Sequence, residues 1–439
     1  MCFRICNSDS LLYTKIEIPP DKKYTTPPCS RYFDRIIEVA DKWAPFNYNV
    51  EYCLSELVPQ TCSYSGNLPI VVVVIICNLI KMICMLFTAF RLGSGSLITI
   101  GDAVASFLAQ PESTTKSRCL LSRDEVVKEV DRQRYHPDKS RQLPPVPMTA
   151  RVSRQKWASA ASWARWIFTI SLFVLALIIS FVLLSMAISG IRSHGVPPLS
   201  IKMGVVTPAA IVTGWGIGEE EGSPSAKIIT SILIANTPQM IFSFLYLNLN
   251  GLLTTMWLAE EWSDFASQRK ALRTSKPRGQ QRSTHFLQLP YKISLPLMVL
   301  SGVLHWLISQ SVFLAVVAEY TSTGELDSPV AIASCGYSPI AMIITIALGV
   351  LLVLATIALG QRKYDGSIPL VGSCSLAISA ACHRPEWDTD AAVRPVLWGV
   401  IPKSGSISEG SEVGHCAFTS GEAEPLQEGR EYAGEMKID

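Results

Sequence analysis

Polar side chains interrupt an apolar run in the second half of the chain. The stretch "VLHWLISQS" contains His305, and Ser301, His305 and Ser309 follow one another every four residues. At 3.6 residues per helical turn these three side chains share one face. Histidine changes its charge near neutral pH. Such a face could carry protons or a ligand, or it could hold two helices together.

Two further apolar runs carry polar stripes. In one of them six polar residues follow at intervals of three or four: Asn236, Gln239, Ser243, Tyr246, Asn250 and Thr254. In the other, Asn78, Lys81 and Thr88 share a face. Lys81 lies about nine residues, roughly 14 Å, from the nearer helix end, and a lysine can snorkel only part of that way.

These stripes support two interpretations. In the functional one they line a path for a substrate or a proton, with seven candidate residues: Asn78, Lys81, Asn236, Gln239, Asn250, His305 and Ser309. In the structural one the same groups bond to one another between helices, each bond contributing about 1 kcal/mol or less. Gln310 points away from His305 and needs a different neighbour.

The elements that carry the stripes are long enough to cross a membrane. The chain has 439 residues, of which 49% are hydrophobic and 17% charged. Five segments reach the roughly 20 apolar residues that a bilayer requires: 69–90, 166–188, 228–259, 295–318 and 338–360. We therefore predict an all-α polytopic integral membrane bundle of about five helices, with partly disordered loops and tail.

The distribution of Lys and Arg predicts the orientation of these helices. Loop 91–165 carries 13 basic residues and loop 260–294 carries seven, whereas residues 189–227 carry three and residues 319–337 none. Because basic loops stay in the cytoplasm, we expect three regions. Residues 1–68 are external, residues 69–360 form the membrane domain with cytoplasmic loops 91–165 and 260–294, and residues 361–439 form a cytoplasmic tail. The protein is expected in the plasma membrane or an endomembrane.

Cysteines on the external side are candidates for a disulfide bond. Cys53 and Cys62 stand nine residues apart just before the first apolar segment, and disulfides persist outside the cell. They form the candidate bridge, although spacing alone does not determine connectivity.

The connecting segments contain helical patterns. "GSGSLITIGDAVASFLAQPE" predicts an amphipathic helix that could lie in the membrane interface. "SRDEVVKEVDRQRY" predicts a charged helix, followed by His136, Pro137 and Asp138, the tripeptide of J-domain co-chaperones. Three prolines follow within ten residues, which argues against the long helix that a J-domain needs there.

The tail after the fifth segment contains groups that a soft metal ion prefers. These are Cys374, Cys382, His383, His415 and Cys416. Their spacing differs from that of zinc sites, whose ligands are typically two to four residues apart, so we predict no metal ion. From Ser404 onward Gly, Ser and Glu dominate, which predicts disorder toward the end.

The sequence gives no sign of enzymatic chemistry. The spans contain no paired aspartates and no His-Glu metalloprotease signature, and "GWGIGEEEGS" follows no strand-like run. We expect no enzyme activity, no cofactor and no nucleic-acid partner. The expected partners are the lipid bilayer and either cytoplasmic proteins or further copies of the chain.

Several stretches resemble a large family of uncharacterised fungal multi-pass membrane proteins that is defined by a domain of unknown function. The resemblance rests on the run from "LIANTPQMIFSFLYLNLNG" to "VLSGVLHWLISQSVF", and on "YNVEYCLSE", "TIGDAVASFL" and "GSCSLAISAACH". It covers residues from about 48 to 432 and implies no activity or ligand residues. Members of that family look longer upstream, so we expect this chain to be shortened at its N-terminus.

Two functions follow as hypotheses. The first is a transporter or channel-like protein that uses the stripes of the first, third and fourth helices. The second is a membrane scaffold or receptor-like protein that binds partners through its basic loops, in particular "EEWSDFASQRKALRTSKPRGQQRS".

Overall fold

The structure is a computed structural model. It describes residues 68–91, 97–135, 147–193, 195–211, 224–285, 289–317, 332–402 and 413–433. The chain divides into two compact units, Met1–Gly93 and Ser94–Asp439. The candidate disulfide of Cys53 and Cys62 and the tripeptide at His136 lie outside the described residues.

The first unit contains helix α4, Leu68–Arg91. Valine and isoleucine dominate its first half, and none of its residues is buried. Large apolar side chains such as Val73, Ile75 and Phe87 are more than half exposed all around the helix. A helix that is apolar on every side is suited to a lipid environment.

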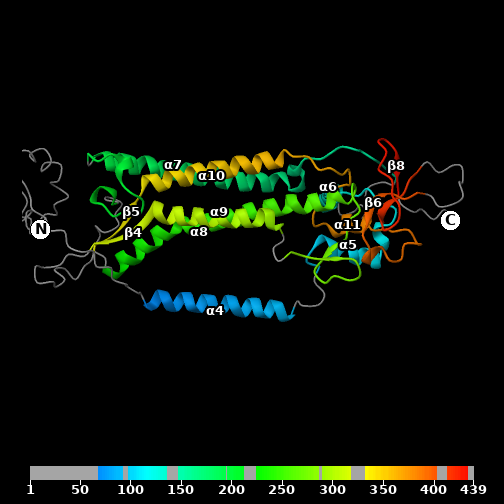
Figure 1. Ribbon diagram of the computed structural model, residues 1–439, viewed down its shortest axis with the longest axis horizontal. Helices are drawn as coiled ribbons and strands as arrows, with labels where there is room; N and C mark the ends of the chain where they lie inside the picture. Colours follow the sequence, from blue (N-terminus) through cyan, green and yellow to red (C-terminus); the bar gives the residue numbers. More distant parts are fainter. Residues whose placement is uncertain are drawn as a thin grey trace, which may run out of the picture. The chain divides into compact units, whose positions relative to one another are not determined.

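Four long helices of the second unit lie side by side (Figure 1). They are α7 (Trp163–Ser193), α8 (Pro224–Asp264), α9 (Tyr291–Ser311) and α10 (Pro339–Gly360). α7 and α9 each pack against both α8 and α10, so the four helices close a ring. With α4, the described residues contain five helices that are long and apolar enough to cross a membrane.

The fourth predicted segment, 295–318, is wrong at its end. α9 ends at Ser311, and the chain continues as strand β4, Val312–Val317, which pairs antiparallel with β5, Ile332–Tyr337. The strand "VFLAVV" is rich in β-branched and aromatic residues, which favour an extended chain. Hydropathy alone could not locate this change, because a short apolar run fits a strand as well as a helix.

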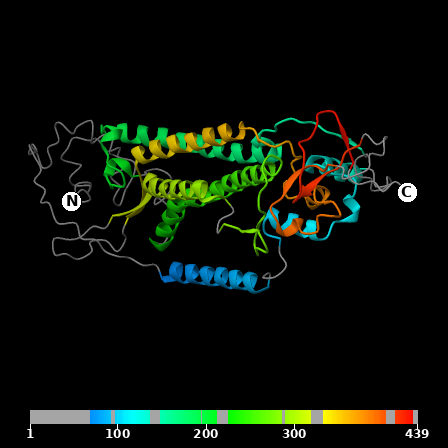
Figure 2. The ribbon, with the colours of Figure 1, turned by 45° about the vertical axis from the view of Figure 1, so that its right-hand side comes forward.

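The segments at the opposite end of the bundle fold together. They contain α5 (Ile100–Ala109), α6 (Arg123–Tyr135), β1 (Met148–Thr149), β2 (Arg273–Thr274), β3 (Arg282–Ser283), α11 (Ser375–Ala380), β6 (Leu397–Val400), β7 (Cys416–Thr419) and β8 (Glu431–Tyr432). Figure 2 shows the cyan segment that contains α5 gathered with the orange and red C-terminal segments beyond the ends of the long helices. We call the described residues of 97–162, 265–290 and 361–433 the loop domain.

The loop domain has a hydrophobic core of its own. Val104 and Leu108 of α5, Leu272 before β2, and Phe418 of β7 are all fully buried in it. The amphipathic helix of "GSGSLITIGDAVASFLAQPE" therefore does not take the membrane-interface position that its sequence allows: α5 turns its apolar face into a protein core. The apolar periodicity correctly predicts a helix with one apolar face, but it does not specify whether lipid or protein covers that face.

The predicted disorder from Ser404 onward is wrong for residues 413–433. β7 pairs antiparallel with β6, and β8 pairs antiparallel with β1. Phe418 and Tyr432 are buried. The few apolar residues of this polar segment are sufficient to fold it, because they are buried in a core to which other segments contribute most of the side chains.

Helix α8 extends farther than its apolar segment. It has 41 residues and runs to Asp264, five positions beyond the expected end at 259. Its last turns include Met256, Ala259 and Trp262, all buried. One continuous helix thus leads from the bundle into the core of the loop domain.

Candidate functional site

The polar stripes of α8 and α9 meet at one pair of residues. His305 Nδ1 and Gln239 Oε1 are 2.6 Å apart, and Gln239 Nε2 donates to the His305 carbonyl at 2.9 Å. An amide oxygen can only accept, so Nδ1 carries the proton in this pair. The Phe242 ring packs edge-on against the imidazole at 4.8 Å. The pair is a direct contact between helices and fits the packing interpretation.

The other stripe residues bond mainly within their own helices. Asn236 Nδ2 donates to the Ile232 carbonyl, and Ser309 Oγ donates to the Trp306 carbonyl. Asn250 is half-buried, and its own carbonyl accepts from Thr254 Oγ1. Bonds to the preceding turn satisfy polar groups in an apolar setting without a second helix.

Asn78 and Lys81 lie on α4, in the first unit. Both side chains are exposed on that helix. Thr88 of the same stripe donates to the Cys84 carbonyl one turn earlier. Gln310 lies in the second unit, where its side chain is close to Gly204. Gly204 has a φ of +70°, a conformation that favours glycine.

A cavity opens where α8 enters the loop domain. Its volume is about 210 Å³, and it is lined by residues from the end of α8, from the segment 270–285 and from Pro290 before α9. The lining contains carboxylates of Glu260, Glu261 and Asp264 on α8. Basic groups face them from the other segment: Lys270, Arg273, Arg282 and His285.

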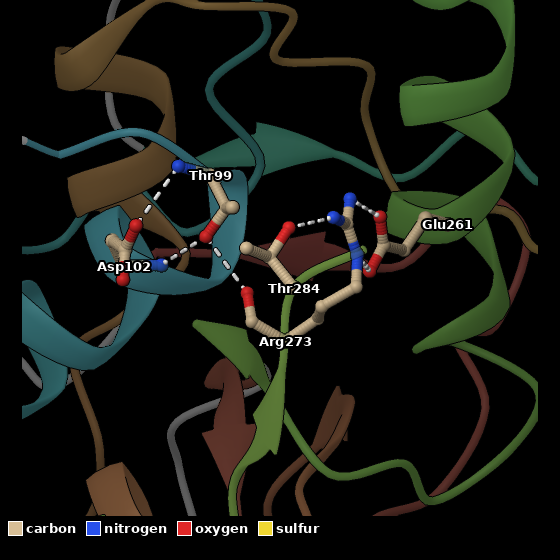
Figure 3. A network of polar contacts seen from close by, with 5 residues as sticks. All are labelled: Thr99, Asp102, Glu261, Arg273 and Thr284. Atoms are coloured by element: carbon tan, nitrogen blue, oxygen red, sulfur yellow. Dashed lines mark hydrogen bonds and ion pairs between the residues drawn. The ribbon is translucent and has the colours of Figure 1, made fainter. Parts of the chain in front are cut away.

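Glu261 and Arg273 form the central ion pair of the cavity wall. Arg273 Nε donates to Glu261 Oε1 at 2.9 Å and Arg273 Nη2 donates to Glu261 Oε2 at 2.6 Å (Figure 3). A third donor, Nη1, reaches Thr284 Oγ1 at 2.6 Å. This two-pronged geometry is the one in which arginine binds a carboxylate most strongly.

The backbone of Arg273 joins the same network to α5. Thr99 caps α5 and donates its hydroxyl proton to the Arg273 carbonyl at 2.7 Å, while Asp102 accepts from the Thr99 N–H at 2.9 Å (Figure 3). Asp102 also accepts from the Ser275 N–H at 2.8 Å. A side chain at Gly101 would collide with the Arg273 carbonyl, so α5 can approach β2 this closely only with glycine there.

These contacts shift the pKa values of their charged groups. The hydrogen bond to Glu261 raises the pKa of Arg273, although burial acts in the opposite direction. Burial alone would raise the pKa of Asp102, but hydrogen bonds from Ser275 and Thr99 outweigh it and lower that pKa. Both groups are thereby held in their charged forms.

The remaining charged groups of the cavity differ in how completely they are paired. Lys270 forms an ion pair with Asp264. Glu260 Oε2 is buried and lacks a hydrogen-bond partner within the described residues. The Trp157 indole lies close to this carboxyl group, yet its N–H also remains without a partner there. Arg282 is exposed and belongs to none of the ion pairs found in the described part of the chain.

The cysteines and histidines of the tail lie in the loop domain. Across the described ranges, no group of three or more His, Cys, Asp or Glu side chains is arranged to hold a metal ion. His415 Nε2 donates to the His383 carbonyl at 2.9 Å. Cys382 and Cys416 are buried. Burial raises the pKa of the Cys382 thiol, so it stays protonated near neutral pH.

The sequence did not single out the cavity residues as a site. Lys270 and Arg282 lie in "EEWSDFASQRKALRTSKPRGQQRS", the segment that the sequence offers for partner binding. The available signal was the mixture of charges directly after an apolar helix, with acids on the last turns and bases about ten residues later. That pattern does not reveal that the segment folds back onto the helix.

Comparisons with known proteins give one result. A family model described as "Domain of unknown function (DUF8419)" matches residues 99–145 and 129–434, which together are well over half of the chain. No curated protein matches, and no solved structure matches.

Proposed function

The chain belongs to the DUF8419 family, a domain without a known function, and from its structure we propose that it is a multi-pass membrane protein with a receptor-like role. Its loop domain, on the cytoplasmic side of a plasma membrane or endomembrane, binds partners or ligands. Five helices that are long and apolar enough to cross a membrane support the membrane location. The proposal includes no catalytic reaction.

One observation carries the receptor-like role. α8 runs without a break from the bundle to the core of the loop domain, and a cavity with charged walls lies beside its last turns. A ligand in this cavity contacts the end of a helix whose other turns pack against α7 and α9. In this proposal, a ligand that binds more tightly to one position of the helix shifts the helix toward that position.

The transport hypothesis has weaker support. It needs the stripes of α8 and α9 to face water, whereas Gln239 and His305 bond to each other at 2.6 Å. Such a pair satisfies its own polar groups and requires no solvent path.

The orientation is tested by glycosylation reporters. An acceptor sequence inserted between β4 and β5 should be glycosylated, and the same sequence inserted after Ala433 should not be, because only external segments meet the modifying enzyme. The unmodified chain and a reporter with a mutated acceptor asparagine serve as controls. Glycosylation after Ala433 would place the loop domain outside the cytoplasm and overturn this part of the proposal.

The partner-binding role is tested on the surface of the loop domain. Deleting 269–282 would remove buried Leu272 and unfold the domain, so charge reversal is preferable. Arg278→Glu changes an exposed residue and should remove specific partners from a proximity-labelling profile. Arg151→Glu, also exposed, is the matched control. Identical profiles for the two variants and the original chain would contradict a partner site on segment 269–282.

A further inference from the structure

The segment that leads into α7 pairs with the segment that follows α10. The backbone N–H groups of Trp157 and Tyr364 donate from one segment to the other, at 2.8 and 2.9 Å. Between these two bonds, Lys156 and Lys363 stand directly opposite each other in an antiparallel bridge. No backbone hydrogen bond joins the two lysines themselves. This is the type of antiparallel pair in which opposed side chains are closest.

The bridge brings two positive charges together. Opposed Cβ atoms are about 4.5 to 5.5 Å apart, and like charges in such a pair are destabilising. Both lysines are exposed, and neither belongs to an ion pair within the described residues. Lys156 Nζ donates to Gln361 Oε1 at 2.8 Å, which is a neutral acceptor. The exposed Asp365 is close in sequence but also belongs to none of these ion pairs. The two ammonium groups therefore have positive charge and N–H donors left for an external anion.

The lysine pair lies where α7 and α10 leave their apolar region. The two helices lie side by side (Figure 1), and Lys363 comes three residues after Gly360, the last residue of α10. Trp166 of α7 lies against Gly360, and its indole N–H donates to the Ala158 carbonyl at 2.9 Å. Tryptophan concentrates at the head-group level of membranes. In the proposed membrane protein, the two ammonium groups therefore lie beside lipid phosphates.

The charge of the pair matches a phosphate monoester better than a phosphate diester. A monoester carries about −1.5 to −2 charge near pH 7 and presents three strong acceptor oxygens. The diester of an ordinary phospholipid carries a single negative charge. Two ammonium groups together balance the charge of a monoester, and each of them has N–H donors for its oxygens. A bound monoester also removes the repulsion between the lysines.

We propose that Lys156 and Lys363 together bind the phosphate monoester head group of a membrane lipid, of which phosphatidic acid is the simplest. Each ammonium group donates to an oxygen of the same phosphate. The inference rests on the proposed function, because it needs α7 and α10 to cross a membrane. Arg362 is not part of the site, since its guanidinium lies over the Trp157 ring at 4.5 Å. Because the two lysines belong to different segments, the bound lipid holds the ends of α7 and α10 together.

The test compares short-chain anionic lipids on the purified full-length protein. Dihexanoyl phosphatidic acid has a phosphate monoester, whereas dihexanoyl phosphatidylserine is anionic but has only a diester. Native mass spectrometry measures the fraction of protein that carries one lipid. We expect phosphatidic acid to bind about tenfold more tightly than phosphatidylserine. Equal affinity would indicate a general attraction to anionic lipids and would overturn the proposal.

Substitution of the lysines tests whether they form the site. Lys156→Gln and Lys363→Gln should each weaken binding of phosphatidic acid about fivefold. The double variant should lose the preference over phosphatidylserine. Lys128→Gln/Arg132→Gln removes the same charge from exposed residues of α6 and should keep the preference. A preference that survives in the double lysine variant would contradict the assigned site.

Unfolding without lipid separates a binding role from a structural one. Lys363→Gln relieves the repulsion between the lysines, so its unfolding temperature should equal or exceed that of the original chain. A binding defect together with this stability supports the proposal. A lower unfolding temperature would show that Lys363 stabilises the fold, and would contradict the unrelieved repulsion on which the proposal depends.

Glycerol 3-phosphate distinguishes a lipid from a soluble phosphate with the same head group. Affinity at least tenfold weaker than that of phosphatidic acid supports the membrane source, and equal affinity contradicts it. The lipid measurements are independent of the glycosylation reporters. If the reporters place the loop domain in the cytoplasm and both lipids bind equally, only this inference fails. If the reporters place it outside, the proposed function fails whatever the lipids do.

Discussion

Arg273 connects α8 to α5 through two different groups. Its guanidinium holds Glu261 and Thr284, and its backbone carbonyl accepts from Thr99. The side chain is 9% exposed, whereas that of Glu261 is 30% exposed. Because the arginine is the more buried partner, its charge depends most on the pair.

The apolar substitution Arg273→Leu should cost more than Glu261→Gln, because glutamine keeps an oxygen that can accept from Arg273. We expect Arg273→Leu to lower the free energy of unfolding by about 2 kcal/mol, since Glu261 and Thr284 both lose their donors, and Glu261→Gln by about 1 kcal/mol. Unfolding in denaturant of the two single variants and the double variant measures the coupling between them. Additive effects of the two substitutions would show that the pair contributes nothing to stability.

Asp102 should make the stability of the folded protein depend on pH. Its pKa is lowered in the folded protein, so its contribution is complete above the unfolded pKa of about 4 and is lost as the pH falls through the lower folded value. The original chain should therefore lose stability between pH 5 and pH 3 more steeply than Asp102→Asn. Unfolding temperatures at both pH values measure this, and parallel losses would contradict the assignment.

At the scale of elements, Gln239 of α8 and His305 of α9 form a contact between two helices. From the sequence alone, these two residues are candidates for a functional site. A histidine and a glutamine in apolar segments suggest a path, yet here each satisfies the other. Both stripes lie on helices, α8 and α9, in segments that the sequence predicts to be helical. The sequence could not show that Gln239 and His305 face each other, because the relative rotation of two helices is determined by packing across their whole interface.

The pair should behave as interhelical packing when it is replaced. His305→Leu leaves Gln239 Oε1 without its donor and should cost about 1 kcal/mol, whereas the double variant Gln239→Leu/His305→Leu should recover most of this loss. Thermal unfolding of the purified protein is the measurement. Ser309→Ala, whose hydroxyl bonds only within its own helix in the described structure, is the control. A double variant that is fully stable but loses a cellular activity would instead favour a transport path.

The whole molecule shows what the sequence could not provide. Hydropathy predicts the long helices. For four of the five predicted segments, the observed helix begins and ends within about five residues of the prediction. Hydropathy does not predict the loop domain, since the core of this domain combines Val104, Leu272 and Phe418 from segments that are far apart in the chain. Each segment alone has too few apolar residues to indicate a domain. The cavity depends on that assembly and was therefore also missed.

Strand β7 should stabilise parts of the molecule that precede it by hundreds of residues. Phe418 is fully buried and packs edge-on against Trp262 and Phe265, at 5.2 and 5.5 Å between ring centres. We expect Phe418→Ala to lower the free energy of unfolding by about 3 kcal/mol or more. Hydrogen exchange should then increase in α5 as well as in β7. Trp387→Ala, at a residue that is 57% exposed, is the control, and an increase confined to β7 would contradict a shared core.

The three-part loop domain has a consequence for synthesis of the chain. The core of α5 is complete only when Phe418 has been made, about 300 residues after α5 itself. At 5 to 20 residues per second a ribosome needs roughly 15 to 60 s for that distance. During this time Val104 and Leu108 have no partner from the tail. The nascent chain must therefore shelter the apolar face of α5 elsewhere, either on the membrane surface or on a chaperone, before the finished protein buries it.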